Sequence, residues 1–336
     1  MVMAIRRPTQ LSFEQVQGEF QRIWGYDDFR PPQGEIIQAL LKQRDALVVM
    51  PTGGGKSICF QLPALLQDGV TIVVSPLIAL MEDQVQELQQ RRLPAALIHS
   101  EQPQAHQRQV LQALQNHQLR LLYLSPETLL SQSVWRVLSQ PQVQINGLIL
   151  DEAHCLVQWG ETFRPAYERL GAVRSALLAT RPAGTHFPIA AFTATASTAE
   201  QAYIAQVLRL DDPYPVKISP YRSQLRLRTQ MVWTPYQRRQ QLQQFLRKQR
   251  GSGLVYVRSR RTSTELAETL AQQGYRVAAY HAGLPTDRRR QIETDWLRDR
   301  LQFVVCTSAF GMGVNKPNVR WVVHYHAPNT LAEYSK

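Results

Sequence analysis

The sequence predicts an α/β fold of two tandem domains, each built on a parallel sheet whose two faces are covered by helices. Short apolar runs recur along the chain, separated by segments of helical pattern or by turns. Strands that are apolar throughout are typical of a parallel sheet, because both of its faces are buried. The series occurs twice, on either side of a proline-rich stretch, and 336 residues are enough for two cores.

In the first half we expect two helices within residues 12–44, the second of them beginning after Pro31 and Pro32. The strands expected here are residues 46–49, 71–75, 95–98, 119–124, 148–151 and 189–192, with helices at 76–90 and 102–116. In the second half the expected strands are residues 254–257, 277–280, 303–306 and 322–325. We predict domains at residues 1–212 and 221–336, joined by a linker at 213–220 that contains three prolines.

A glycine-rich turn, MPTGGGKS at residues 50–57, follows the first expected strand. Its glycines let backbone N–H groups face phosphate oxygens, and the helix that we expect to begin near Lys56 adds its positive end. Lys56 is then placed to reach the β- and γ-phosphates, and the Ser57 hydroxyl to bind magnesium. Met50 departs from the strict pattern, which has glycine there. The predicted site for ATP and Mg²⁺ includes Thr52, Gly53, Gly54, Gly55, Lys56 and Ser57.

A second motif, Asp151-Glu152-Ala153-His154, directly follows an apolar strand. An ATPase with a glycine-rich phosphate loop needs one carboxylate to hold magnesium and another acid to orient and deprotonate the attacking water. We assign the first role to Asp151 and the second to Glu152, and we include His154 and Lys56 among the catalytic candidates. An Asp-Glu pair alone is usually solvated surface, but its place after a strand and behind Lys56 favours this chemistry.

The positive charge of the chain lies in its second half. The formal net charge is +12, but residues 1–217 carry 18 Lys and Arg against 19 Asp and Glu, whereas residues 218–336 carry 20 against 7. Arginine outnumbers lysine, and its planar guanidinium suits phosphate. This distribution favours a polyanionic partner, although charge alone leaves a role in solubility equally open.

Several classes of protein are not indicated by the sequence. The longest apolar segment, residues 70–81, is interrupted by a serine and a proline, so we expect no membrane helix and a cytoplasmic protein. The three cysteines, Cys59, Cys155 and Cys306, form no Cys-x-x-Cys pair. We therefore expect buried, reduced thiols and no zinc site.

The order of these motifs resembles that of the superfamily 2 helicases and, in detail, the RecQ family of DNA helicases. The resemblance extends from about residue 20 to the end of the chain. It implies two tandem RecA-like domains, with ATP and magnesium held between them. It also implies 3′-to-5′ movement along single-stranded DNA and unwinding of duplex or junction DNA in repair and recombination.

Residues 24–33, WGYDDFRPPQ, resemble the adenine-recognition segment of this family. The resemblance implies that Gln33 binds the adenine edge, since an amide can form a bidentate pair with it. Tyr26 offers a ring for stacking on a base, and Arg30 is expected to support the glutamine or approach phosphate. Pro32 stands where family members usually have glycine.

Other segments resemble motifs with which the family holds nucleic acid and nucleotide. Residues 73–81 and 122–127 resemble the two DNA-backbone motifs of the first domain, and residues 255–260, 280–283 and 307–317 resemble motifs of the second. Strand ends of this kind can bind phosphates through N–H and hydroxyl groups. The predicted DNA contacts are Ser75, Pro76, Pro126, Glu127, Ser259, His281, Thr307 and Ser308. The further nucleotide contacts are Gly313 and Asn315, and the residues that couple ATP state to domain movement are Thr193 and Thr195.

Residues 158–167, QWGETFRPAY, resemble the aromatic-rich loop of RecQ proteins, which links DNA binding to ATP hydrolysis. Trp159 and Phe163 offer faces on which unpaired bases can stack, and Arg164 can bind a phosphate or stack. Glu161 and Thr162 stand where the family typically has His-Asp. We expect the acid to weaken the DNA contact or to alter the coupling.

The sequence ends at residue 336, where the family has a helix with two arginines in a Gly-Arg-x-Gly-Arg setting. One of these arginines is a finger that contributes about 10³–10⁵ in rate in related enzymes. We therefore expect the second domain to be incomplete, without the arginine finger and without its last strand. We also expect the zinc-binding and winged-helix modules that usually follow in the family to be missing. Three alternatives to a motor core stay open: a nucleotide-dependent DNA-binding fragment with little turnover, an RNA helicase of the same superfamily, and a small-molecule kinase.

Overall fold

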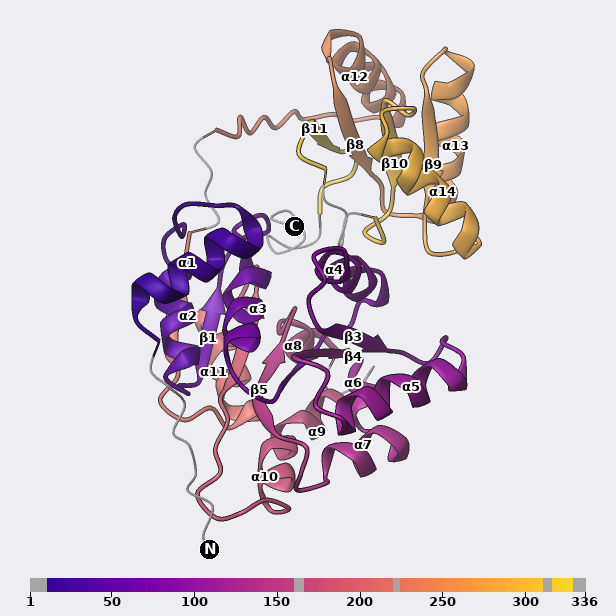
Figure 1. Cartoon of the computed structure of the whole chain (residues 1–336). Helices are drawn as coiled ribbons and strands as arrows, with labels where there is room; N and C mark the ends of the chain where they lie inside the picture. Colours follow the sequence, from indigo (N-terminus) through magenta and orange to yellow (C-terminus); the bar gives the residue numbers. More distant parts are fainter. Residues whose placement is uncertain (1–10, 160–165, 220–223, 311–315, 329–336) are drawn as a thin grey trace, which may run out of the picture. The chain divides into compact units, whose positions relative to one another are not determined.

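The computed structural model divides the chain into two compact α/β units, and the division falls at residue 221 (Figure 1). The structure describes residues 11–159, 166–219, 224–310 and 316–328. Within these residues, no helix combines the length and the apolar character that crossing a membrane requires. Each unit is built on its own parallel sheet, which confirms the predicted fold class.

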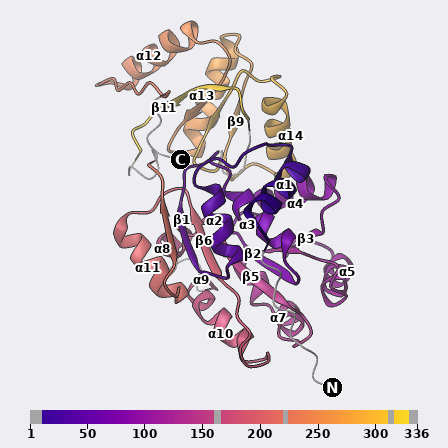
Figure 2. The same ribbon diagram turned by 60° about the vertical axis from the view of Figure 1, so that its left-hand side comes forward.

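The first unit contains a seven-stranded sheet in the order β3-β4-β2-β5-β6-β1-β7, and every neighbouring pair of strands is parallel. Figure 2 shows β2, β5, β6 and β1 side by side near its centre. All carboxyl ends therefore meet at one edge, where the turns that carry the motifs begin. The strands are β1 (Ala46–Val49), β2 (Val70–Val74), β3 (Ala95–Ile98), β4 (Leu121–Leu124), β5 (Ile145–Leu150), β6 (Ile189–Thr193) and β7 (Tyr214–Lys217).

Helices cover both faces of this sheet, because successive residues of each strand point to opposite sides (Figure 1). Ala46 and Val48 pack with α2, α3 and α4, whereas Leu47 packs in the cluster that includes α5, α7, α10 and α11. The helices of this unit are α1 (Phe13–Trp24), α2 (Gln33–Leu41), α3 (Lys56–Leu66), α4 (Ile78–Gln90), α5 (Gln104–Gln115), α6 (Pro126–Leu129), α7 (Gln132–Leu138), α8 (Cys155–Trp159), α9 (Ala166–Arg169), η1 (Leu170–Ala172), α10 (Val173–Leu178) and α11 (Thr198–Leu208).

The expected strands of the first half are all present, but the predicted linker at residues 213–220 is wrong in part. Four of its residues form β7, which pairs in parallel with β1. Without β7, the N–H and C=O groups on one side of β1 would have no strand partner. Pro215 is tolerated there because β7 is an edge strand, whose outer side makes no ladder bonds.

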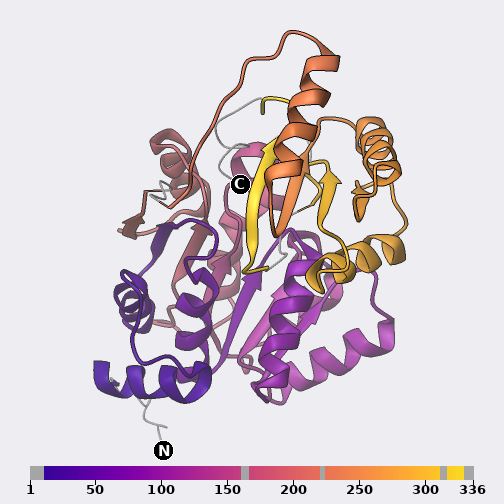
Figure 3. The same cartoon turned by 90° about the horizontal axis from the view of Figure 1, so that it is seen from above.

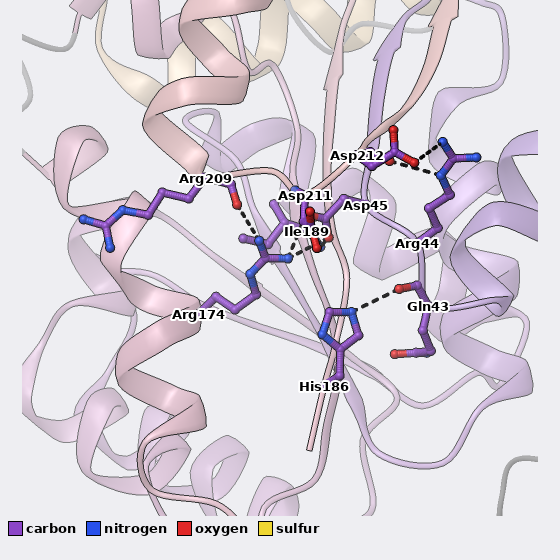
Figure 4. Close-up of polar contacts among 9 residues, drawn as sticks. All are labelled: Gln43, Arg44, Asp45, Arg174, His186, Ile189, Arg209, Asp211 and Asp212. Atoms are coloured by element: carbon purple, nitrogen blue, oxygen red, sulfur yellow. Dashed lines mark hydrogen bonds and ion pairs between the residues drawn. The ribbon is translucent and has the colours of Figure 1, made fainter. Parts of the chain in front are cut away.

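A buried carboxylate holds the starts of three of these strands together (Figure 4). Asp45, the residue before β1, is 2% exposed, and Arg174 Nη1 donates to its two carboxylate oxygens at 2.7 and 2.8 Å. The backbone N–H groups of Ile189 and Asp211 donate to the same carboxylate, each at 2.8 Å. The Asp45 carbonyl accepts from the N–H of Tyr214 at 2.7 Å. One side chain thereby joins β1, β6 and the turn before β7.

Around this pair, exposed polar groups make further contacts between the same segments (Figure 4). Arg174 Nη2 also donates to the Arg209 carbonyl at 2.5 Å, and Arg44 forms an exposed ion pair with Asp212 at 2.9 Å. Exposed pairs of this kind contribute little to stability, because water screens them. The Asp45–Arg174 pair is therefore the contact on which this end of the sheet depends.

The second unit, orange to yellow in Figure 3, has a four-stranded parallel sheet in the order β11-β8-β10-β9. The clusters on its two faces show that α12 and α13 cover one face and α14 the other. The four expected strands are present, although the last begins three residues earlier than predicted. The elements are α12 (Pro235–Lys248), β8 (Ser252–Tyr256), α13 (Arg260–Gln272), β9 (Val277–Tyr280), α14 (Thr286–Leu297), β10 (Phe303–Cys306) and β11 (Val319–His324).

We expect Asp45→Ala to lower the free energy of unfolding by about 3–5 kcal/mol, because it leaves the largely buried Arg174 charge and two N–H groups without their acceptor. Arg44→Ala, which breaks the exposed pair with Asp212, should cost at most about 1 kcal/mol. Urea denaturation of both variants measures the difference. Equal costs would contradict the assignment of the buried pair as the anchor.

Candidate functional site

The glycine-rich loop joins β1 to α3 at the carboxyl edge of the first sheet. Gly53 and Gly55 have φ angles of +77° and +80°, a left-handed backbone that favours glycine. Lys56 begins α3, and its Nζ donates to the Met50 carbonyl at 3.1 Å. The Met50 side chain is 1% exposed and packs in the core beside Gly54. Position 50 therefore does not require glycine, because the core accommodates the methionine side chain, and this explains why the departure from the strict pattern is tolerated.

Gln33 connects the expected adenine-recognition segment to this loop. It is 3% exposed, its Oε1 accepts from the Arg30 N–H at 2.9 Å, and its Nε2 donates to the carbonyls of Gly54 and Gly55 at 3.2 and 3.4 Å. A Cβ atom on Gly55 would collide with the Gln33 amide. Tyr26 is 54% exposed, so its ring is available for stacking. The structure thus joins Gln33 and the backbone of Arg30 to the glycine-rich loop.

Asp151 and Glu152 lie at the end of β5, at the same edge of the sheet. Asp151 is buried, and its Oδ1 accepts from the N–H of Glu152 at 3.0 Å. Burial raises the pKa of Asp151 and the charge of Glu152 raises it further, while the positive charge of Lys56 lowers it. Glu152 has a φ of +52°, a strained conformation of the kind that clusters at functional sites.

The donor set of this site fits magnesium. The Asp151 carboxylate and the Ser57 hydroxyl are oxygen ligands, which Mg²⁺ prefers. A cation beside Asp151 would favour the ionised form that burial disfavours. The chemistry of these two donors therefore fits the predicted metal role, and the role itself stays a prediction.

His154 links the Asp-Glu-Ala-His motif to the predicted coupling residues. Its ring is 5% exposed, and Nδ1 lies 3.2 Å from Glu152 Oε2 and 3.3 Å from the Thr193 hydroxyl. The same hydroxyl donates to the Thr195 carbonyl at 3.1 Å and accepts from the Thr195 N–H at 3.3 Å. The path from Glu152 to the coupling segment uses the side chain of Thr193 but only the backbone of Thr195.

The sequence analysis missed a chain of buried polar groups that ends at Asp151. Gln61 Nε2 of α3 donates to the Tyr123 hydroxyl at 3.0 Å and to Gln84 Oε1 of α4 at 3.5 Å. The side chain of Gln84 in turn bonds to Asp151 and lowers its pKa. Gln61 gave a usable signal, because it is a polar residue on the buried side of an otherwise apolar helix.

The DNA-contact candidates of the first unit follow the neighbouring strands β2 and β4. Ser75 is 1% exposed, and among the described residues its hydroxyl has no hydrogen-bond partner. Pro76 and Pro126 are buried, whereas Glu127 is exposed in the first turn of α6. The two proline side chains pack inside the unit, so a contact with DNA at these turns would involve neighbouring groups.

The candidates of the second unit follow three adjacent strands in the same way. Ser259 comes after β8 and caps α13, its Oγ accepting from the Thr262 N–H at 3.0 Å. His281 follows β9, with Nε2 3.4 Å from the Thr264 hydroxyl. Thr307 and the exposed Ser308 follow β10. The structure therefore places all four at the carboxyl edge of the second sheet.

Some predicted residues lie outside the described part of the chain. These are Phe163, Arg164, Gly313 and Asn315, together with the side chain of Trp159 at the end of α8. In the ranges that the structure describes, no group of three or more His, Cys, Asp or Glu is arranged to hold a metal ion. Cys59, Cys155 and Cys306 are buried and form no disulfide, as expected.

Comparison with known proteins identifies the class first. A DEAD/DEAH box helicase model matches residues 30–202, and a helicase conserved C-terminal domain model matches residues 237–336. Among solved structures, the Mycobacterium smegmatis helicase Lhr bound to single-stranded DNA and AMP-PNP has a TM-score of 0.68 at 19% identity, over 95% of this chain and 45% of Lhr. S. cerevisiae Dbp5 bound to RNA and ADP BeF3 has a TM-score of 0.71 at 16% identity, over 96% of this chain and 84% of Dbp5. The two units are thus the RecA-like domains of a superfamily 2 helicase.

Curated relatives identify the family. ATP-dependent DNA helicase RecQ of Synechocystis sp. is 55% identical over 96% of this chain and 67% of its own length. The proteins of the same name from Haemophilus influenzae and Pasteurella multocida are each 41% identical, over 98% and 93% of this chain and 51% and 48% of their own lengths. The chain belongs to the RecQ family. It spans about half to two thirds of the length of these relatives.

We expect Gly55→Ala to weaken nucleotide binding at least about tenfold more than Gly53→Ala. Both substitutions carry the cost of left-handed backbone, about 1–2 kcal/mol, but only the Cβ at Gly55 meets the Gln33 amide. Titration with a fluorescent ATP analogue measures the effect. In a Gln33→Ala background the additional cost of Gly55→Ala should disappear, and its persistence there would contradict the collision.

Proposed function

We propose that this chain is the motor core of a RecQ-type, ATP-dependent DNA helicase, which couples ATP hydrolysis to 3′-to-5′ movement along single-stranded DNA. The observation that carries the proposal is that the parallel sheet brings the glycine-rich loop after β1 and the buried Asp151 after β5 to one edge, where the positive charge of Lys56 lowers the pKa of Asp151. Membership of a family whose curated relatives are named ATP-dependent DNA helicases supports it.

In this proposal, the N–H groups of residues 53–55 and the Lys56 ammonium hold the phosphates of ATP. Ser57 and Asp151 hold Mg²⁺, which supplies positive charge beside the phosphoryl group. Glu152 orients and deprotonates the attacking water. Tyr26, Arg30 and Gln33 recognise the adenine, and the contact of Gln33 with the loop gives base recognition a direct connection to the phosphate site.

Single-stranded DNA is the proposed partner at the carboxyl edges of the two sheets. Backbone contacts are assigned to the turns that carry Ser75, Glu127, Ser259, His281 and Ser308, because strand ends with free N–H and hydroxyl groups suit phosphates. The aromatic loop at residues 158–167 supplies stacking faces for bases. Unwinding of duplex or junction DNA in repair and recombination, by a cytoplasmic enzyme, is the corresponding cellular role.

Coupling between these sites is assigned to the contact of His154 with Thr193. Nδ1 of His154 lies beside both Glu152, the proposed general base, and the hydroxyl of Thr193 in the coupling segment. A change at the γ-phosphate that moves Glu152 would therefore reach Thr193 through one imidazole ring. The bond from Thr193 to the Thr195 backbone extends this path into the turn after β6.

The alternative functions differ in the nucleic acid that is bound and in whether ATP is hydrolysed. An RNA helicase is the second candidate, but the structures bound to RNA are too distant in sequence to indicate more than the fold. The curated relatives named for DNA are far closer. A small-molecule kinase would leave the second unit without a role. A DNA-binding fragment with little turnover is separated from a motor core by measuring ATP hydrolysis.

We expect single-stranded DNA to stimulate ATP hydrolysis by this chain and RNA of the same length to stimulate it much less. Lys56→Ala should reduce the stimulated rate about 100-fold or more, because the phosphate site loses its charged donor. Phosphate release, measured with each nucleic acid, tests both statements. ATP binding without turnover would favour the DNA-binding fragment, and equal stimulation by RNA would favour the RNA helicase.

Thr193→Val should reduce DNA stimulation of ATP hydrolysis several-fold more than it reduces the basal rate. The substitution keeps the side-chain shape and removes the hydroxyl that contacts His154 and the Thr195 backbone. Thr195→Val is the matched control, since only the Thr195 backbone takes part in these contacts. Equal losses in the two variants would contradict a coupling path through the Thr193 side chain.

A further inference from the structure

The second sheet has a basic surface at the edge opposite its motif residues. Strands in a parallel sheet start at one edge and end at the other, so the amino-terminal ends of β8, β9, β10 and β11 share an edge that carries none of the proposed site residues. We call the exposed cations beside these strand starts the basic edge. They are Arg247, Lys248, Arg250, Arg276, Arg298, Arg300 and Arg320.

Most of the basic edge is not neutralised by acidic side chains. Arg300 pairs with Asp295 at 3.1 Å. The carboxylate of Asp299, which also lies here, is occupied by the buried Lys316 at 2.7 Å and by the hydroxyl of Ser252 at 2.8 Å. The other cations have no carboxylate partner among the residues that the structure describes: Arg247, Lys248, Arg250, Arg276, Arg298 and Arg320. Six positive charges are therefore available to a ligand.

A pocket of about 460 Å³ lies within the basic edge. Arg250 and Arg276 line it, together with side-chain amides and the neutralised Asp299. Arg276 is oriented by its Nη1, which donates to the Asp299 carbonyl at 3.2 Å. Arg320 lies against the adjoining turn, with its Cγ 2.7 Å from where a Cβ on Gly251 would be. Leu301 is the only large apolar residue in the lining, which does not suit an apolar small molecule.

Helix electrostatics explain only part of this surface. Cations at a carboxyl-terminal helix end stabilise the helix dipole, and this accounts for Arg247 and Lys248 in the last turn of α12. Arg250 and Arg276 lie in the loops before β8 and β9, and Arg320 lies within β11. A ligand with several negative charges is the simpler explanation for these three.

We propose that the basic edge binds the phosphate backbone of duplex DNA, through Arg250, Arg276 and Arg320, as a contact separate from the motif edge. Duplex DNA has about one negative charge per 1.7 Å of helix axis, so it is a polyanion dense enough to meet several of these arginines at once. Duplex binding at the basic edge rests on the proposed helicase function in one respect, namely that DNA is the polyanion which the chain encounters. It adds a surface that holds duplex while the motif edges hold a single strand.

The test is the salt dependence of duplex binding by an Arg250→Gln, Arg320→Gln double variant of this chain. Each lost phosphate contact removes about 0.9 from the slope of log K against log salt concentration. We expect the slope for a 20-base-pair duplex, measured without nucleotide by fluorescence anisotropy, to fall by about 2, with about tenfold or greater loss of affinity at low salt. ATP hydrolysis stimulated by a short single-stranded oligonucleotide should be unchanged.

Two controls separate a surface contact from net charge and from misfolding. Arg108→Gln, Arg136→Gln removes the same charge from exposed positions on α5 and α7 of the first unit and should leave the slope as it was. Arg250→Lys, Arg320→Lys should retain most of the slope, since a lysine still neutralises a phosphate.

An unchanged slope in the glutamine variant, or an equal loss in the first-unit control, would overturn the proposal. If the glutamine variant loses binding to polyglutamate but still binds duplex DNA, the proposal is overturned in favour of an acidic protein as the partner. Failure of single-stranded DNA to stimulate the parent chain would instead count against the proposed function. The duplex titration, made without nucleotide, reports on the basic edge independently of that result.

Discussion

The buried ion pair between Asp45 and Arg174 is the interaction on which the geometry of the first unit depends. It joins residues 129 positions apart in the chain, and the same carboxylate accepts the N–H groups that precede or begin neighbouring strands. The pair holds β1 in register with β6, and β6 pairs in turn with β5. Because β1 leads into the glycine-rich loop and β5 leads into Asp151, this register sets where the two halves of the nucleotide site lie.

A second constraint acts at the opposite edge, where the site keeps a carboxylate in a place that disfavours its charge. Burial raises the pKa of Asp151, and Lys56 and Gln84 oppose that rise. The cost of holding the ionised form without a cation is the physical reason for expecting a metal there. The contacts of His154 with Glu152 and Thr193 then connect this strained, charged edge to the turn after β6.

Local patterns were sufficient for most of the strands and for the position of the motifs. Apolar runs such as residues 46–49 form strands that are buried on both faces, and a series of such runs separated by helical segments predicts a parallel sheet. Local patterns were insufficient for β7. Pro213 and Pro215 predict a linker, but the segment forms a strand because it pairs with the otherwise open side of β1. The same holds for Gln84, whose place on a partly exposed helix gives no local sign that it bonds to Asp151.

The sequence by itself determined the features that predict the chemistry of this protein: the order of Lys56, Asp151, Glu152 and Thr193, the RecQ-like motifs, and a net positive charge that lies in the second half. These features are properties of residue type and spacing, which need no partner distant in the chain. Only the tertiary structure decided that Gln33 contacts the glycine-rich loop, that His154 bridges two motifs, and that unpaired arginines gather at one edge of the second sheet. Strand order and register bring such residues together, and long-range packing, not local pattern, sets both.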